Sequence, residues 1–306
     1  TSIANDVRQY TLNLLHHSVL RQILVDEKLQ TSGVMKGLYP KKQLHEFRVA
    51  CLIHLENIYI YSMLAAEKRG VTLTGVQGIN KARSKWNAAN KNPQIFFGHE
   101  KSSELLTNQI ALGTNGRYKS PMMKMHFFST DYRYDLPESK PVWQAAEAFI
   151  RNVPELKKLH AAALTYMQLK MQASHKRDLN PFFEDIPFGL KKAYVKAFRD
   201  PKMVGDYSRI FWLQRTGLDK YAAGAIYRVL KQERLDELEL TDAEVFKRAM
   251  HQAKSMPEMN ESDLRALQHI SQAEPFLSLI DLMFSGLRRQ SSQTLAEFRQ
   301  FWQSRG

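Results

Sequence analysis

Basic and aromatic side chains are interspersed along the segment 79–126, and their types suit the binding of a phosphate polymer. The segment holds eight Lys and Arg residues against two acids, with Trp86, Phe96, Phe97 and Tyr118 set among them. Lys and Arg neutralise phosphates, and an aromatic ring offers a face on which a nucleobase stacks. These residues therefore favour nucleic acid as a ligand.

A short basic helix is predicted over 79–91. Lys81 and Lys85 share a helix face because they lie four residues apart. Such a helix could lie against phosphates, and its polar side chains could reach base edges. A solvated helix anchored in the core by Trp86 fits the same sequence, so both interpretations stay open.

The run GTNGRYKSP at 113–121 is the most unusual short stretch of the chain. Its two glycines, Thr and Asn free the backbone, and Arg117 and Lys119 follow directly. Such a loop lets backbone N–H groups approach a phosphate while the cations add charge. It is not a P-loop, because the GxxxxGK[ST] spacing is missing. A tight turn with exposed cations is the alternative.

Together these runs define one set of predicted nucleic-acid contacts, and double-stranded DNA is the favoured ligand. The segment has fewer large aliphatic side chains than its flanks, so 91–100 and 113–121 are expected to bury little and to move. The predicted contacts are Lys81, Arg83, Lys85, Trp86, Lys91, Arg117, Tyr118, Lys119 and Lys124.

No catalytic or metal-binding signature stands in the chain. The ten histidines lack the spacings typical of zinc ligands, and the single cysteine, Cys51, lies in an apolar stretch. Acids near cations at 184–185 and 200 lack the convergence that metal-dependent cleavage needs. No cofactor or metal is expected, and a non-enzymatic protein is favoured. Arg265 and His269, four residues apart, leave a cryptic nuclease open as an alternative.

Helical periodicity dominates on both sides of the basic segment. Apolar residues recur every three or four positions in 4–29 and 41–68. The second stretch is apolar on more than one face, which is typical of a buried central helix. Capping boxes at Thr241/Glu244 and Thr294/Glu297 mark two helix starts. Further helices are predicted from Ser139 through Phe149, from Pro154 through Met171, and at 190–199, 202–215, 219–238, 263–273 and 275–287.

The middle of the chain has a different pattern. Six of the fourteen glycines fall within 70–116. Short helices at about 79–90 and 101–112 are predicted to precede a tight turn at Asn115-Gly116 and a strand at 121–129. Helix, turn, helix and hairpin is the element order of a winged helix-turn-helix.

The chain is therefore predicted to be mainly α, with three regions. A helical pair at 1–69 precedes a basic, glycine-rich subdomain at 70–138, which resembles a winged helix with a short β-hairpin. A multi-helix bundle at 139–306 completes the fold.

The formal charge of +13 is unevenly placed. The net charge is +3 over 1–69, +5 over 70–135, +7 over 136–230 and −2 over 231–306. A basic surface favours nucleic acid, anionic lipid or an acidic protein. Nucleic-acid binding within a larger assembly is the leading function. A helical scaffold or adaptor for an acidic protein is the alternative, with 275–287 as its apolar contact surface.

The expected setting is the cytoplasm, without membrane contact. The mean hydropathy of −0.43 is low, no apolar run of transmembrane length is evident, and the N-terminal residues lack the order of a secretory signal. A single cysteine excludes an internal disulfide.

Overall fold

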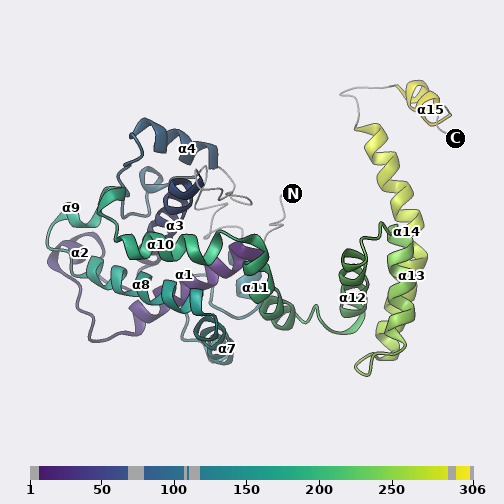
Figure 1. Ribbon diagram of the computed structural model, residues 1–306, viewed down its shortest axis with the longest axis horizontal. Helices are drawn as coiled ribbons and strands as arrows, with labels where there is room; N and C mark the ends of the chain where they lie inside the picture. Colours follow the sequence, from purple (N-terminus) through teal and green to yellow (C-terminus); the bar gives the residue numbers. More distant parts are fainter. Residues whose placement is uncertain (1–6, 68–78, 107–108, 110–117, 289–293, 304–306) are drawn as a thin grey trace. The chain divides into compact units, whose positions relative to one another are not determined.

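Helices account for nearly all regular structure in this computed structural model, which describes residues 7–67, 79–106, 109, 118–288 and 294–303 (Figure 1). These residues include one isolated β-bridge, between Gln94 and Phe182, and no β-strand. The prediction of a mainly α protein is confirmed. The elements are α1 (Val7–Val25), α2 (Gly33–Leu38), α3 (His45–Glu67), α4 (Ile79–Ala88), η1 (Lys101–Ser103), α6 (Lys119–Lys124), α7 (Ser139–Asn152), α8 (Pro154–Met171), α9 (Lys176–Leu179), η2 (Phe183–Asp185), α10 (Phe188–Phe198), α11 (Pro201–Thr216), α12 (Tyr221–Leu235), α13 (Asp242–Ala253), α14 (Glu261–Leu287) and α15 (Leu295–Gln303).

The chain divides into two compact units. Unit 1 comprises residues 1–212 and unit 2 comprises residues 213–306. This division differs from the three regions expected from the sequence. The expected subdomain 70–138 instead contributes Trp86, Phe97 and Phe127 to the core of unit 1, because these aromatic side chains are buried among the surrounding helices.

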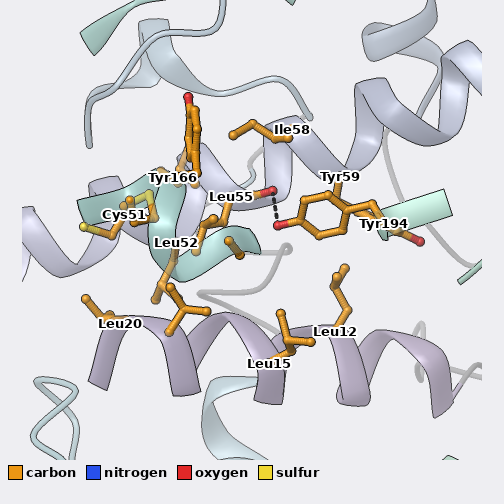
Figure 2. Packing of buried hydrophobic residues seen from close by; sticks show 14 of the residues in the cluster. Leu12, Leu15, Leu20, Cys51, Leu52, Leu55, Ile58, Tyr59, Tyr166 and Tyr194 are labelled. Carbon is orange, nitrogen blue, oxygen red and sulfur yellow. Dashed lines mark hydrogen bonds between the residues drawn. The ribbon is translucent and has the colours of Figure 1, made fainter. Parts of the chain in front are cut away.

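Helix α3 forms the centre of unit 1. It is buried along almost its whole length, as its apolar residues on several faces predict, and α1, α4 and α10 contact it. Figure 2 shows Leu12 and Leu15 of α1 facing Leu52 and Leu55 of α3, with Tyr194 of α10 closing the cluster. The Tyr194 hydroxyl donates a hydrogen bond to the Leu55 carbonyl at 3.4 Å.

The length and composition of α3 would allow it to cross a membrane, contrary to the expectation that no stretch qualifies. In unit 1, however, 94% of its most apolar window is buried. Such burial is usual for the central helix of a soluble protein.

Buried histidines of α1 and α3 are bonded to tyrosine hydroxyls. Desolvation by burial lowers the pKa of His16 and of His54 to about 3, and lowers that of His17 well below its ordinary value. The core therefore holds these rings neutral. The pairs are His16 Nε2 with Tyr194 Oη at 2.9 Å, His17 Nδ1 with Tyr134 Oη at 2.6 Å, and His54 Nε2 with Tyr166 Oη at 2.9 Å.

The winged-helix prediction is wrong for the residues that the structure describes. The expected strand 121–129 is replaced by the short helix α6 and a turn, and Phe127 and Phe128 are buried there. The expected helix 101–112 is absent from 104–106, which follow a single 3-10 turn. The predicted turn at Asn115-Gly116 lies outside the described residues.

Unit 2 packs α12, α13 and α14 around a small core of Ala225, Val229, Val245, Ala249 and Leu267, with neighbouring buried residues. The predicted capping box at the start of α13 is formed, because the Thr241 hydroxyl accepts from the Glu244 N–H and the Glu244 carboxylate accepts in return.

Of two further sequence predictions in unit 2, one is confirmed and the other is wrong. The box at Thr294 and Glu297 is also formed. The predicted break before residue 275 is wrong, since Pro275 lies inside the continuous helix α14. Proline removes one backbone donor, and α14 continues through it.

The buried histidines predict acid-sensitive stability. Their folded pKa values lie below the unfolded value, so their stabilisation is present above about pH 6.5 and is lost as the pH falls toward about 3. Between about pH 7 and about pH 5, we expect His16 and His54 each to lower the free energy of unfolding of unit 1 by about 2 kcal/mol. Urea denaturation followed by tryptophan fluorescence measures this slope.

In the variant His54→Phe, the fall in the free energy of unfolding between about pH 7 and about pH 5 should be smaller by about 2 kcal/mol, the contribution of one buried histidine. The control His269→Gln, an exposed histidine of unit 2, should leave it unchanged. Parallel pH profiles for the wild-type chain and His54→Phe would contradict the assignment.

Candidate nucleic-acid interface

Trp86 anchors α4 in the core. Its side chain is 8% exposed, and its ring stacks on Tyr61 at 5.5 Å and meets Phe183 edge-on at 5.0 Å. Tyr118 is also buried, with its ring 4.8 Å from that of Tyr10. A base therefore has no open face on Trp86 or Tyr118, which conflicts with the predicted stacking role for these rings.

Two of the predicted cations fasten α4 to its neighbours. Arg83 Nη2 lies 2.6 Å from Glu67 Oε1 at the end of α3, and this hydrogen bond raises the pKa of the guanidinium. Lys85 Nζ donates to the Glu104 carbonyl at 2.9 Å, and burial lowers the pKa of Lys85. Both side chains remain partly accessible, but each already has an acceptor within unit 1.

The predicted cations near α6 differ in their surroundings. Lys119 Nζ lies over the Tyr132 ring, 4.5 Å from its centroid, and burial lowers its pKa. Lys124 ends α6 and is exposed. Arg117 lies outside the described residues.

The outward surface of α4 has some of the exposed polar and basic side chains that the sequence predicted. Asn80, Ser84 and Asn87 are exposed, Lys81 is half-buried, and Lys91 is exposed just after the helix. These polar side chains remain accessible to a nucleic-acid ligand.

The segment 91–100 is tightly held, so the prediction that it buries little is wrong. Ile95 and Phe97 are buried, and their N–H groups donate to the Pro181 carbonyl and the Asn180 side chain, both at 2.8 Å. These contacts fix the segment to the turn after α9. Most of the second expected mobile loop, 113–117, lies outside the described residues.

An open groove of about 670 Å³ lies between α3 and α10, and sequence reasoning did not select it. Its lining combines small apolar side chains with four cations from consecutive turns of one helix. The lining residues are Ser62, Ala65 and Ala66 of α3, Phe183 of η2, Phe188, Lys191, Lys192, Val195 and Lys196 of α10, and Arg199 directly after α10.

Helical periodicity explains this side of α10. Lys192, Lys196 and the C-cap residue Arg199 follow Phe188 by four, eight and eleven positions, so they fall on the same face as Phe188. The opposite face carries the buried residues of α10. Those residues are Leu190, Tyr194, Ala197 and Phe198.

The four cations of the groove differ in whether they already bind an acceptor within unit 1. Lys191 Nζ donates to the carbonyls of Phe183 and Glu184 at 3.0 and 3.3 Å, and burial lowers its pKa. Lys196 Nζ lies 4.0 Å from a Glu155 oxygen with more than half of its side chain exposed. A pair at that distance and exposure leaves Lys196 accessible to another anion.

Lys192 and Arg199 are the most available cations of the groove. Both are exposed, and neither side chain hydrogen-bonds or forms an ion pair with any residue that the structure describes. With Lys196 they form what we call the α10 cation stripe: Lys192, Lys196 and Arg199.

The groove adjoins the predicted α4 site through η2. The Phe183 ring packs against Trp86 of α4 and lies under Lys191 of α10, 4.7 Å from its Nζ. The Asn92 side chain accepts from the Glu184 N–H at 2.9 Å. Cations of α4 and α10 therefore belong to neighbouring surfaces of unit 1.

Two sequence signals pointed to α10. The largest regional charge excess, +7, falls in 136–230, and the cations of α10 recur at helical spacing. The glycine-rich pattern of 79–126 led instead to the prediction of a binding site in that segment. The groove itself could not be predicted, because α3 and α10 are far apart in the sequence and meet only in the folded chain.

The other chemical candidates do not converge on a site. Arg265 Nη2 pairs with Glu261 at 2.9 Å on exposed α14, one turn from the exposed His269. No group of three or more His, Cys, Asp or Glu side chains among the described residues could hold a metal ion. Burial raises the pKa of the Cys51 thiol, as expected for a core residue.

Comparison with known proteins gives no family, because no family model, curated protein or solved structure matches the chain.

The burial of Trp86 predicts a stability defect on its removal. We expect Trp86→Ala to lower the free energy of unfolding by about 3–5 kcal/mol, the usual cost of a cavity left by a large aromatic side chain. Urea denaturation checks this value. Phe96→Ala, which removes an exposed aromatic side chain of the same segment, is the control and should change stability by under about 1 kcal/mol. Unchanged stability in Trp86→Ala would contradict the core role.

Proposed function

We propose that unit 1 binds nucleic acid as a non-enzymatic component of a larger assembly, and that the α3–α10 groove is its main contact surface. The observation that carries this proposal is the α10 cation stripe beside that groove. Lys192 and Arg199 have no partner among the described residues, so phosphates could neutralise them without breaking a contact of the fold.

The charge distribution supports the same ligand class. The segment 136–230 that contains α10 has a net charge of +7, and α4 adds Lys81 and Lys91 on the neighbouring surface. Phosphate contacts position a protein on nucleic acid without reading its sequence. The proposal therefore concerns affinity and placement, not a sequence preference.

Double-stranded DNA is the proposed ligand for the outward surface of α4. Asn80, Ser84 and Asn87 are exposed there, and amide and hydroxyl side chains are suited to phosphates and base edges. Arg83 and Lys85 support this surface mainly by holding α4 on α3 and η1.

Salt dependence tests the α10 cation stripe. Each phosphate contact contributes a slope of about −0.9 in the log–log plot of affinity against salt for a duplex, and about −0.7 for a single strand. We expect Lys192→Ala with Arg199→Ala to weaken binding and to reduce the steepness of the slope by about 1.4–1.8. Fluorescence anisotropy with labelled oligonucleotides over a salt series measures both quantities.

A variant with the same change of charge is the control. Lys140→Ala with Lys176→Ala removes two exposed cations of α7 and α9 that do not line the groove. If both double variants lower the slope equally, net charge and not the groove determines binding. If the wild-type chain binds no nucleic acid at low salt, the proposed function is wrong.

A protein-binding scaffold is the second candidate, and the surface of α14 favours it. Phe276, Leu277, Leu279, Leu282 and Phe284 are exposed within the single stretch that the sequence marked as an apolar contact. Contiguous apolar exposure of this kind often marks an interaction surface. The proposed partner is an acidic protein, which would also meet the positive charge of the chain.

Co-purification from the native host tests this second function. We expect Phe276→Ser with Phe284→Ser to release a partner that the wild-type chain retains, because apolar contact area is lost. Ile210→Ser, an exposed apolar residue of unit 1, is the control and should retain it. A partner lost equally from all variants, or no partner at all, would contradict a docking role for α14.

A further inference from the structure

We infer that the α3–α10 groove holds an unpaired stretch of nucleic acid, with one base stacked on Phe188. This inference rests on the proposed function and names the form of nucleic acid that the groove takes. Sequence reasoning favoured duplex DNA and placed stacking on Trp86 and Tyr118, whose rings are buried.

Phe188 presents the open ring that those residues do not. It is the first residue of α10 and 73% of it is exposed, although it lines the groove. The Phe188 ring makes no contact with another aromatic ring among the described residues. An aromatic face beside cations is the combination by which proteins bind single strands without regard to sequence.

The cations stand at the right place to hold the backbone of the same strand. Lys192 lies one helical turn beyond Phe188, and Lys196 and Arg199 follow on the same face. Eleven residues of helix rise by about 16 Å from Phe188 to Arg199. A strand that runs along α10 would therefore meet a stacking surface at one end and phosphate ligands over the next two turns.

The apolar part of the groove argues against a duplex as its occupant. Ala65, Ala66 and Val195 offer a surface suited to the face of a base, not to a phosphate. In a duplex the base faces are covered by their stacked neighbours, whereas an unpaired base can lie on an aromatic ring. The volume of about 670 Å³ lies within the range of small-molecule sites and is ample for a nucleotide.

The test compares three labelled probes on the full chain by fluorescence anisotropy: a thymidine single strand, an abasic strand of the same length, and a blunt duplex. The abasic strand keeps the phosphates and removes the base faces. We expect the wild-type chain to bind the thymidine strand about 5- to 150-fold more tightly than the abasic strand, the range for loss of one stacked base.

The variant Phe188→Ala should lose that difference, with an unchanged affinity for the abasic strand. Phe188→Trp should keep it, because the aromatic face is retained. Phe276→Ala is the matched control, since it removes another highly exposed phenylalanine, from unit 2. Phe188 is exposed, so its replacement leaves the core of unit 1 intact.

Three results would overturn the inference while leaving nucleic-acid binding in place. They are equal binding of the thymidine and abasic strands, equal loss of both strands in Phe188→Ala, and a loss of duplex affinity in Phe188→Ala as large as the loss of thymidine-strand affinity. Absence of binding to all three probes would overturn the proposed function together with the inference.

Discussion

Unit 1 depends on the burial of α3 along almost its whole length. A helix buried to this extent must find internal partners for its buried polar side chains, because an unpaired buried polar group costs about as much as a lost hydrogen bond. His54, Glu56 and Asn57 follow closely on α3 and are all buried. Much of the surrounding chain is arranged to satisfy them.

Described residues between α4 and α6 perform this task. The Phe96 carbonyl accepts from the His54 ring at 3.4 Å, the Ser103 carbonyl accepts from the Asn57 amide at 2.9 Å, and Gln109 donates to Glu56 at 2.7 Å. Residues that looked like a loose basic surface in the sequence are thus fixed by the polar requirements of α3. Of the predicted cations, Arg83 on α4 pairs with Glu67 at the end of α3.

Helix α10 differs from α3, because only one of its faces is buried. One face gives Tyr194 and Phe198 to the core, where Tyr194 bonds to His16 and to the Leu55 carbonyl. The other face is exposed, and neither Lys192 nor Arg199, which directly follows the helix, has a partner among the described residues. A rigid helix, fixed by its buried face, thereby presents cations and one aromatic ring at fixed spacing. Pre-organised groups of this kind lose less entropy on binding than side chains on a mobile loop.

The helical class followed from the sequence, because apolar periodicity and capping residues are local signals that do not depend on how the helices pack. The sequence also located the central helix at 41–68, the capping box at Thr241 and the excess of positive charge. It did not determine which cations stay free, since Arg83 pairs with Glu67 and Lys85 donates to the Glu104 carbonyl only when α4 packs beside these residues in the folded chain.

Tertiary structure alone decided the site and the subdivision of the chain. Tyr61 and Phe183 cover the ring of Trp86, whereas the ring of Phe188 is exposed. The amino-acid composition of a segment does not show which of its aromatic rings is covered. The groove between α3 and α10 exists because two helices more than a hundred residues apart in sequence pack together. Hydrophobic burial is non-directional, so the pattern of apolar residues fixes which faces are buried but not which partners cover them.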